Sequence, residues 1–134
     1  MLIGSCHCGA VKYEAPGKVL RFSYCHCDDC RKITGGPFGA AIVAQASGFR
    51  VTAGEPELTA YASSPGKARN FCRRCGTHLF SKMDSAPDIV IIRAGTVEGD
   101  HGLKPQMHIW VSAKAAWDDI RDDLPQHAEW PPKK

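Results

Sequence analysis

Three cysteines crowded into six residues are the most distinctive feature of this 134-residue sequence. Cys25, Cys27 and Cys30 follow one another as Cys-x-Cys-x-x-Cys. Zinc binds thiolate sulfur at about 2.3 Å in a tetrahedral arrangement, so three closely spaced sulfurs fill three corners and leave the fourth for another ligand. The spacing therefore predicts a catalytic type of zinc site with one exchangeable position.

The other four cysteines form two more short-spaced pairs, Cys6 with Cys8 and Cys72 with Cys75. Together these pairs would complete a closed four-sulfur site, in which the binding energy of the metal is largely folding energy. We therefore expect two Zn²⁺ ions per chain, one structural and one catalytic.

A competing partition of the cysteines joins Cys25 and Cys27 to Cys72 and Cys75. It completes one four-sulfur site but leaves Cys30 without a metal partner, so the ligand count favours the first partition.

Basic residues adjoin the cysteine motifs at Arg31, Arg73 and Arg74. Three thiolates on a divalent cation leave one net negative charge, which these side chains could offset, and they could also receive the carboxylates of a bound substrate. A metal lowers the pKa of a bound thiol, so a thiol substrate would bind as its thiolate at neutral pH. The same ion could instead activate water or polarise a carbonyl, and the sequence does not choose between these roles.

A thiolate that attacks an aldehyde generates an alkoxide, which needs a hydrogen-bond donor or a proton source. His108 is the candidate for this role, because it lies in an apolar strand-like segment that also contains Trp110. His26 lies between two cysteines, and strand-like alternation predicts that its side chain points away from the metal. His7 is interpreted in the same way, and His78 has no stronger support.

The composition fits one ordinary globular domain, with 43% hydrophobic and 23% charged residues. We expect a single zinc-binding domain over residues 1–124 and a loosely ordered tail over 125–134, which is rich in proline and charge. No stretch approaches the roughly 20 apolar residues of a membrane helix. The first residues are too short for a secretory signal, so we expect a cytoplasmic protein whose seven cysteines are thiols or ligands.

The net charge is +3, from 17 basic and 14 acidic residues, and there is no long basic run. Phosphate binding usually requires a concentrated basic face, so this balance argues against nucleic acid as the main partner.

Short strands should position the cysteine motifs, because apolar and polar residues alternate in brief runs between turn residues. We expect strands within residues 2–6, 10–14, 19–24, 38–44, 49–54, 58–61, 79–81, 89–92 and 107–111. Asp28 should cap a short helix that continues to Lys32, and Ser112 should cap a longer helix with Ala115 and Ile120 on its inner face.

Three segments carry a resemblance to a known family: Cys-His-Cys-Gly-Ala-Val at 6–11, Cys-His-Cys-Asp-Asp-Cys-Arg-Lys at 25–32 and Phe-Cys-Arg-Arg-Cys-Gly-Thr at 71–77. With these motifs in this order, the sequence closely resembles the glutathione-dependent formaldehyde-activating enzyme family, which includes centromere protein V. The resemblance implies a mainly β fold, a zinc-braced antiparallel β-tent (Mss-like) with short helices.

The resemblance also implies the partition of ligands favoured above. The structural set would be Cys6, Cys8, Cys72 and Cys75, and the catalytic set Cys25, Cys27 and Cys30. The family's named activity joins glutathione to formaldehyde, giving S-hydroxymethylglutathione, and is classed as a carbon–sulfur lyase. The leading hypothesis is therefore a zinc-dependent enzyme acting on glutathione or a related thiol adduct.

Two other functions are compatible with the motifs. A non-catalytic zinc module that binds protein or nucleic acid would need no open metal position. A redox sensor built on residues 25–30 would form a reversible disulfide and release its metal under mild oxidation, but simple ligation explains the spacing equally well.

Overall fold

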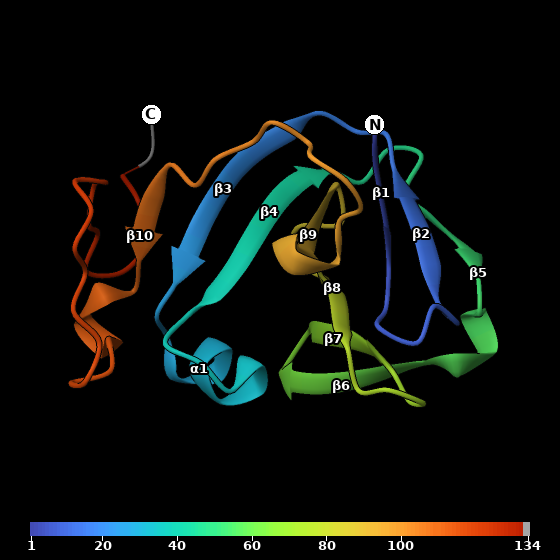
Figure 1. Cartoon of the computed structure of the whole chain (residues 1–134), viewed down its shortest axis with the longest axis horizontal. Helices are drawn as coiled ribbons and strands as arrows, with labels where there is room; N and C mark the ends of the chain where they lie inside the picture. The colour runs from blue at the N-terminus through green and yellow to red at the C-terminus, as the bar shows by residue number, and fades with distance from the viewer. Residues whose placement is uncertain (133–134) are drawn as a thin grey trace. The chain divides into compact units, whose positions relative to one another are not determined.

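The computed structural model describes residues 1–132, and the prediction of a mainly β fold is confirmed (Figure 1). The strands in these residues are β1 (Leu2–Ser5), β2 (Lys12–Ala15), β3 (Val19–Cys25), β4 (Gly39–Gln45), β5 (Arg50–Ala53), β6 (Leu58–Ser64), β7 (Lys67–Cys72), β8 (His78–Met83), β9 (Ile89–Arg93) and β10 (Met107–Ile109). The helices are α1 (Asp28–Thr34) and the short 3₁₀ helices η1 (Glu55–Glu57), η2 (Ala94–Thr96) and η3 (Val111–Ala113).

The chain forms two compact units. The first unit consists of Met1–Leu20 and Ile42–Gly102, and the second consists of Arg21–Ala41 and the described chain from Leu103 on. Strands β3 and β4 each begin in one unit and end in the other. This division does not test the single domain expected over residues 1–124, which stays a prediction.

A small antiparallel sheet of the order β1-β2-β5 opens the first unit. Tyr13 of β2 lies opposite Gly4 of β1, and its side chain is 1% exposed. A Cβ atom on Gly4 would lie 2.3 Å from the Tyr13 ring, so a glycine is required where this ring crosses β1. Alternation along these short strands thus buries one face and places Cys6 directly after β1.

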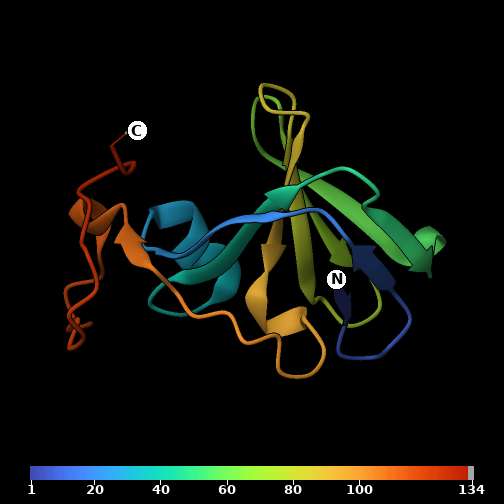
Figure 2. The same ribbon diagram turned by 90° about the horizontal axis from the view of Figure 1, so that it is seen from above.

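The rest of the first unit is built on strands that are neighbours in the order β4-β9-β8-β7-β6. Strands β6 to β9 pair antiparallel, each with the next along the chain, as the green to yellow ribbons of Figure 2 show. Cys72 ends β7, and the turn to β8 includes Gly76, whose φ of 79° is in the left-handed region that favours glycine. This hairpin therefore positions the Cys72–Cys75 pair.

Aromatic side chains form part of the core of the first unit. The ring centroid of Phe49 lies 4.7 Å from that of Phe80 and 5.7 Å from that of Tyr13. The Tyr13 hydroxyl forms a 2.8 Å hydrogen bond with Thr96, and burial raises the pKa of Tyr13 to about 12. The buried phenol therefore remains a neutral donor and links β2 to η2.

In the second unit, the sheet order is β10-β3-β4, and β10 pairs parallel with β3, an exception to the antiparallel pattern expected for the fold. Helix α1 follows β3 after a two-residue connection, and its N-cap is Cys27, not the expected Asp28. The Cys27 sulfur accepts a 3.4 Å hydrogen bond from the Cys30 backbone N–H. One cysteine of the triplet therefore caps the helix that contains another.

The prediction of a longer helix after Ser112 is wrong. Only the short 3₁₀ helix η3 forms there. Trp110 has a φ of 58°, which interrupts a regular helical path. The backbone N–H of Ser112 donates to the Ala128 carbonyl at 3.1 Å, and its hydroxyl donates to the same oxygen at 2.7 Å. The Ser112 side chain therefore binds the following chain segment instead of capping a helix.

Residues 125–129 form backbone hydrogen bonds around β10. The His108 N–H donates to Pro125 O at 2.8 Å, the His127 N–H donates to His108 O at 2.9 Å, and the Trp110 N–H donates to Glu129 O. These contacts hold 125–129 against the strand that contains His108, whereas residues 133 and 134 of the expected tail lie outside the described part of the chain.

Within residues 1–132, none of the helices has the length and apolar character needed to cross a bilayer.

Replacing Ser112 by alanine should lower the free energy of unfolding by about 1 kcal/mol, because the Ala128 carbonyl loses a hydroxyl donor. Urea unfolding followed by tryptophan fluorescence would measure this change. Ser64→Ala, at an exposed position of β6, is the matched control and should be close to neutral. Equal effects of the two substitutions would contradict the role given to the Ser112 hydroxyl.

Candidate metal centres

The first cysteine cluster lies in the first unit, where two turns meet. The turn after β1 is closed by a 3.0 Å hydrogen bond from the Gly9 N–H to the Cys6 carbonyl. The turn after β7 is closed in a similar way, by a 2.7 Å bond from the Gly76 N–H to the Cys72 carbonyl. Each turn is therefore set by local hydrogen bonds and presents a pair of thiols.

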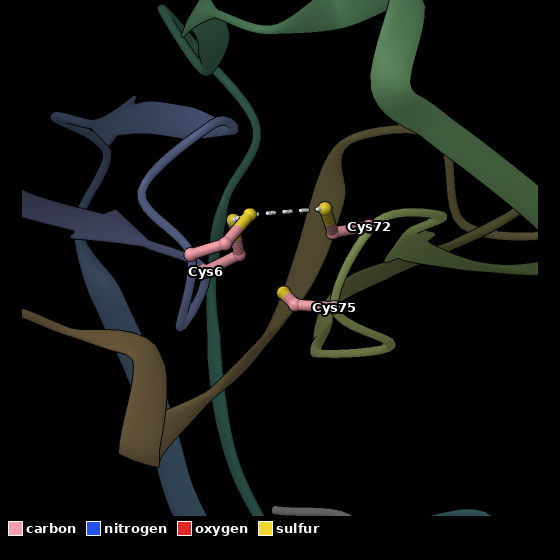
Figure 3. Close-up of side chains that lie close together, drawn as sticks. Cys6, Cys72 and Cys75 are labelled. Atoms are coloured by element: carbon pink, nitrogen blue, oxygen red, sulfur yellow. Dashed lines mark hydrogen bonds between the residues drawn. The ribbon is translucent and has the colours of Figure 1, made fainter.

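The structure brings both pairs together, because the ligand atoms of Cys6, Cys8, Cys72 and Cys75 all lie within 4.8 Å of one another. Figure 3 shows the sulfurs of Cys6, Cys72 and Cys75 turned toward a common space. The sulfur of Cys8 is 3.6 Å from that of Cys6 and 3.8 Å from that of Cys72. A tetrahedron with 2.3 Å zinc–sulfur bonds has edges of about 3.8 Å, so these spacings fit a tetrahedral thiolate site.

Hydrogen bonds and burial affect these four thiols unequally. A hydrogen bond with the Thr77 hydroxyl, 3.2 Å away, is the largest cause that lowers the pKa of Cys75 to about 5. For Cys8 a hydrogen bond from the backbone of Ala10 lowers the pKa, but desolvation and the neighbouring thiols outweigh it and raise the value to about 11. Four thiolates would thus repel one another without a cation, which is the condition that a metal ion relieves.

The second cluster comprises Cys25, Cys27 and Cys30 in the second unit, and their sulfurs also lie within 4.8 Å of one another. Cys25 ends β3, Cys27 caps α1, and Cys30 lies in the first turn of this helix. The sulfurs of Cys25 and Cys27 are 3.4 Å apart. Within residues 1–132 no histidine or carboxylate joins this group, so the donor set offers a metal three thiolates and an open position.

Apolar side chains surround this second cluster. Cys25 and Cys30 are buried with Ile109, and Met107 and Trp110 lie against them. Hydrogen bonds with Cys27 and Cys30, followed by burial, raise the pKa of Cys25 far above its ordinary value. The Cys25 thiol would therefore stay protonated without a cation, whereas a divalent ion would deprotonate it.

His26 and His108 form a buried pair beside the second cluster. Their side chains are 0% and 2% exposed, and His26 Nε2 lies 2.8 Å from His108 Nδ1. The other ring nitrogen of His108, Nε2, lies 2.9 Å from a carboxylate oxygen of Asp122. Both nitrogens of His108 are therefore occupied by protein partners.

This chain of contacts sets the tautomers of the two rings. The Asp122 carboxylate accepts a hydrogen bond, so His108 carries its proton on Nε2 and accepts on Nδ1. His26 must then donate from Nε2, and its Nδ1 faces Asp118, whose nearest oxygen is 3.9 Å away. The His26 side chain thus points toward His108 of β10.

Aromatic rings enclose this histidine pair. The ring centroid of Phe38 is 5.3 Å from that of His26, and the ring centroid of Tyr24 is 5.4 Å from that of His108. Burial is the main cause that lowers the pKa of His26, with a further contribution from His108. His26 is therefore held in an apolar setting that favours its neutral ring.

Two of the arginines proposed to bind substrate have acidic partners. Arg31 Nη2 lies 2.6 Å from Asp28, and its Nε is buried without a partner. Arg73 donates to Glu57 at 2.8 Å, and Arg74 is exposed beside it in the turn of the first cluster. Arg31 therefore lies with the second cluster, and the other two lie with the first.

His7 and His78, the other two histidines considered from the sequence, lie in the first unit. His7 is exposed, and its backbone N–H donates to the Thr77 hydroxyl at 3.1 Å. The ring of His78 stacks on Phe71 with a centroid distance of 5.4 Å. The backbone of His7 and the ring of His78 therefore both contact neighbouring residues of the fold.

Asp118 and Asp122 were missed by reasoning from sequence alone. Asp118 falls in the segment assigned to a helix, where acidic residues are typical of a solvated face, and Asp122 follows the last residue placed on that helix. Asp122 instead accepts from His108, and that hydrogen bond is the main cause that lowers the Asp122 pKa. The partners of these two aspartates could be predicted only if the path of the chain after β10 were known.

Taken together, a mainly β fold with a four-thiol cluster and a three-thiol cluster defines a class of cysteine-rich, candidate metal-binding β proteins. Comparison with known families makes this more specific. The model of the family described as glutathione-dependent formaldehyde-activating enzyme matches residues 1–113, and the chain belongs to this family.

Relatives of known sequence and structure agree with this assignment. A Halomonas elongata protein that bears the family's name is 30% identical over 128 residues, covering 90% of this chain and 81% of the relative. An uncharacterised lyase of Schizosaccharomyces pombe is 32% identical over 112 residues, covering 83% and 79%. The crystal structure of a Rhodobacter sphaeroides protein is similar with a TM-score of 0.62 and 30% identity, covering 74% of this chain and 90% of that chain.

The Asp122–His108 hydrogen bond should make stability depend on pH in the acid range. Because the folded-state pKa of Asp122 is lowered, its contribution is present above the unfolded value of about 3.9 and is lost as pH falls through the folded value. Wild-type protein should therefore lose more stability than Asp122→Asn between roughly pH 5 and pH 3.

Urea unfolding at constant ionic strength and equal metal content would measure this difference. Asp119→Asn is the matched control, because Asp119 is 76% exposed and its nearest cation, Arg121, is 3.9 Å away. If the control and Asp122→Asn show the same acid profile, the proposed contribution of Asp122 is wrong.

Proposed function

We propose that this protein is a zinc-dependent, carbon–sulfur lyase-type enzyme that joins a thiol such as glutathione to formaldehyde or acts on a related thiol adduct. The observation that carries the proposal is the convergence of three buried or half-buried thiols without a fourth side-chain ligand among residues 1–132. Membership of a family named for glutathione and formaldehyde supports the choice of substrates.

We assign the two clusters different roles. The four-thiol cluster would hold a structural zinc ion, because its donor set is complete. The three-thiol cluster would hold the catalytic zinc ion, whose chemistry is to keep a bound thiol deprotonated at neutral pH. Seven free cysteines fit a reducing compartment, so we place the enzyme in the cytoplasm.

In the synthetic direction the thiolate sulfur attacks the aldehyde carbon and a carbon–sulfur bond forms. The electron pair of the carbonyl π bond moves to oxygen, which takes up a proton, so the proton lost by the thiol balances the one gained by the alkoxide. The reverse reaction breaks the same bond. Apolar residues around Cys25 and Cys30 exclude water from the sulfur atoms, which strengthens electrostatic interactions at the reacting centre.

We propose that His108 acts through His26. Both ring nitrogens of His108 have protein partners, so its contribution would be to orient His26. The His26 backbone N–H donates to Ile109 O at 3.0 Å, which fixes the peptide between two of the thiols. His108 is thus a positioning residue that holds the Cys25–Cys27 segment against β10.

For the charged side chains we propose two roles. Arg31 follows Cys30 directly, and its unpartnered Nε could meet a carboxylate of the thiol substrate. Arg73 and Arg74 adjoin the four-thiol cluster, where they would offset its negative charge.

Replacing Cys27 by serine should remove one zinc ion per chain and lower thiol-dependent turnover by more than about a hundredfold, because a ligand of the open site is lost. Metal analysis would measure the zinc content. Carbon-13 NMR of labelled formaldehyde mixed with glutathione would measure the turnover.

Cys8→Ser is the matched comparison, because it removes a thiol from the complete cluster. This substitution should instead lower the zinc content of the four-thiol cluster and the thermal stability of the protein. A wild-type protein that holds zinc fully but turns over no thiol adduct would favour the non-catalytic module and overturn the proposed enzyme.

A further inference from the structure

Two arginines of the first unit are buried in the sheet. Arg69 of β7 is 2% exposed, and Arg93 of β9 is 7% exposed. A guanidinium remains charged at any pH at which proteins are folded, and a buried charge is costly unless it is paired. Neither arginine forms an ion pair within residues 1–132, so the burial of these two charges requires an explanation.

The two side chains project from the same face of the sheet. Arg69 lies opposite Ser81 of β8, and Ser81 lies opposite Ile91 of β9. Arg93 comes two residues after Ile91, so strand alternation places it on the face of Arg69 and Ser81. Burial is the main cause that lowers the pKa of His78, and the charges of Arg93 and Arg69 lower it further.

Each guanidinium has a nitrogen without a partner. Arg69 Nε donates to the Ser63 hydroxyl at 2.9 Å, which fixes the orientation of this guanidinium. The Nη1 atoms of Arg69 and Arg93 are both buried and have no hydrogen-bond acceptor. Each of these donors can bind a carboxylate oxygen, and one carboxylate would also neutralise one of the charges.

Arg93 is held at its position by neighbouring contacts. Its backbone carbonyl accepts a 2.8 Å hydrogen bond from the Thr96 hydroxyl, and Thr96 in turn contacts the buried Tyr13 hydroxyl. The end of β9 is thus tied to the core, so the guanidinium extends from a fixed backbone.

We propose that Arg69 and Arg93 form a binding site for a small carboxylate anion in the first unit. Its two arginines belong to the first unit, whereas Cys25, Cys27 and Cys30, for which the thiol chemistry is proposed, belong to the second. Its ligand completes the hydrogen bonds of two buried cations and so stabilises the folded sheet.

Acetate is the probe for this proposal, with chloride used to keep the ionic strength constant. The thermal midpoint of the zinc-loaded full chain should rise with acetate beyond the rise with chloride, because a ligand bound only to the folded state stabilises it. Arg69→Gln and Arg93→Gln should each weaken acetate binding by at least about tenfold, measured by calorimetry.

Arg50→Gln is the matched control, because Arg50 is an exposed arginine of the same unit that pairs with Glu14. It should bind acetate like wild type, and so should Cys27→Ser, which tests the proposed enzyme separately. The site is overturned if acetate stabilises wild type no more than chloride does, or if both glutamine variants retain acetate binding.

A measurement on the wild-type chain covers the case in which the variants do not fold. NMR of nitrogen-15-labelled arginine side chains should show acetate-dependent shifts at Arg69 and Arg93 and none at Arg50; the absence of shifts at the first two would overturn the site. Displacement of acetate by inorganic phosphate at lower concentration would overturn the assignment to carboxylates.

S-methylglutathione identifies the source of the carboxylate without offering a free thiol. If it displaces acetate, the site accepts a carboxylate of glutathione-like ligands; if it does not, the site takes a free small carboxylate. Either result supports a carboxylate site, and neither depends on turnover.

Discussion

The repulsion that closely spaced thiolates would exert on one another is the constraint on which the rest of this structure depends. Local turns hold the sulfurs of Cys6 and Cys8 3.6 Å apart, and those of Cys25 and Cys27 3.4 Å apart. Such spacings suit neutral thiols or thiolates that share a cation, but not free thiolates. Each unit contains one of these clusters, so a metal ion in each would couple ligation to the folding of that unit.

The surroundings of the two clusters differ in a way that fits different chemistry. In the first cluster a hydroxyl and backbone donors reach the sulfurs, for example the Val11 N–H to Cys6 Sγ at 3.3 Å, and all four ligand positions are filled by the chain. In the second, one backbone N–H reaches the Cys27 sulfur, apolar residues surround the cluster, and three thiols converge. A complete ligand set with hydrogen-bond donors to the sulfurs suits a structural metal ion. An incomplete ligand set among apolar residues suits the binding of an incoming thiol.

Most strands and their turns could be predicted because their signals are local, but β7 (Lys67–Cys72) was not among the expected strands. Alternation and glycine-rich turns mark β1, β2 and the Cys72–Cys75 hairpin within a few residues. The helix after Ser112 was wrong because the competing acceptor, Ala128, lies 16 residues away. The pairing of His108 with Asp122 was missed for the same reason, since it follows from the path of the chain and not from periodicity.

The sequence and the structure point to different arginines as candidates for binding an anion. The arginines next to the cysteines attract notice in the sequence, yet Arg31 and Arg73 already have acidic partners. Arg69 and Arg93 lie in ordinary-looking strands, where the pattern gives no sign that a charged side chain is buried. A guanidinium paired at the surface is largely satisfied by water and its partner, whereas a buried one must find an acceptor. The demand for an anion is therefore greater at Arg69 and Arg93 than beside either cysteine cluster.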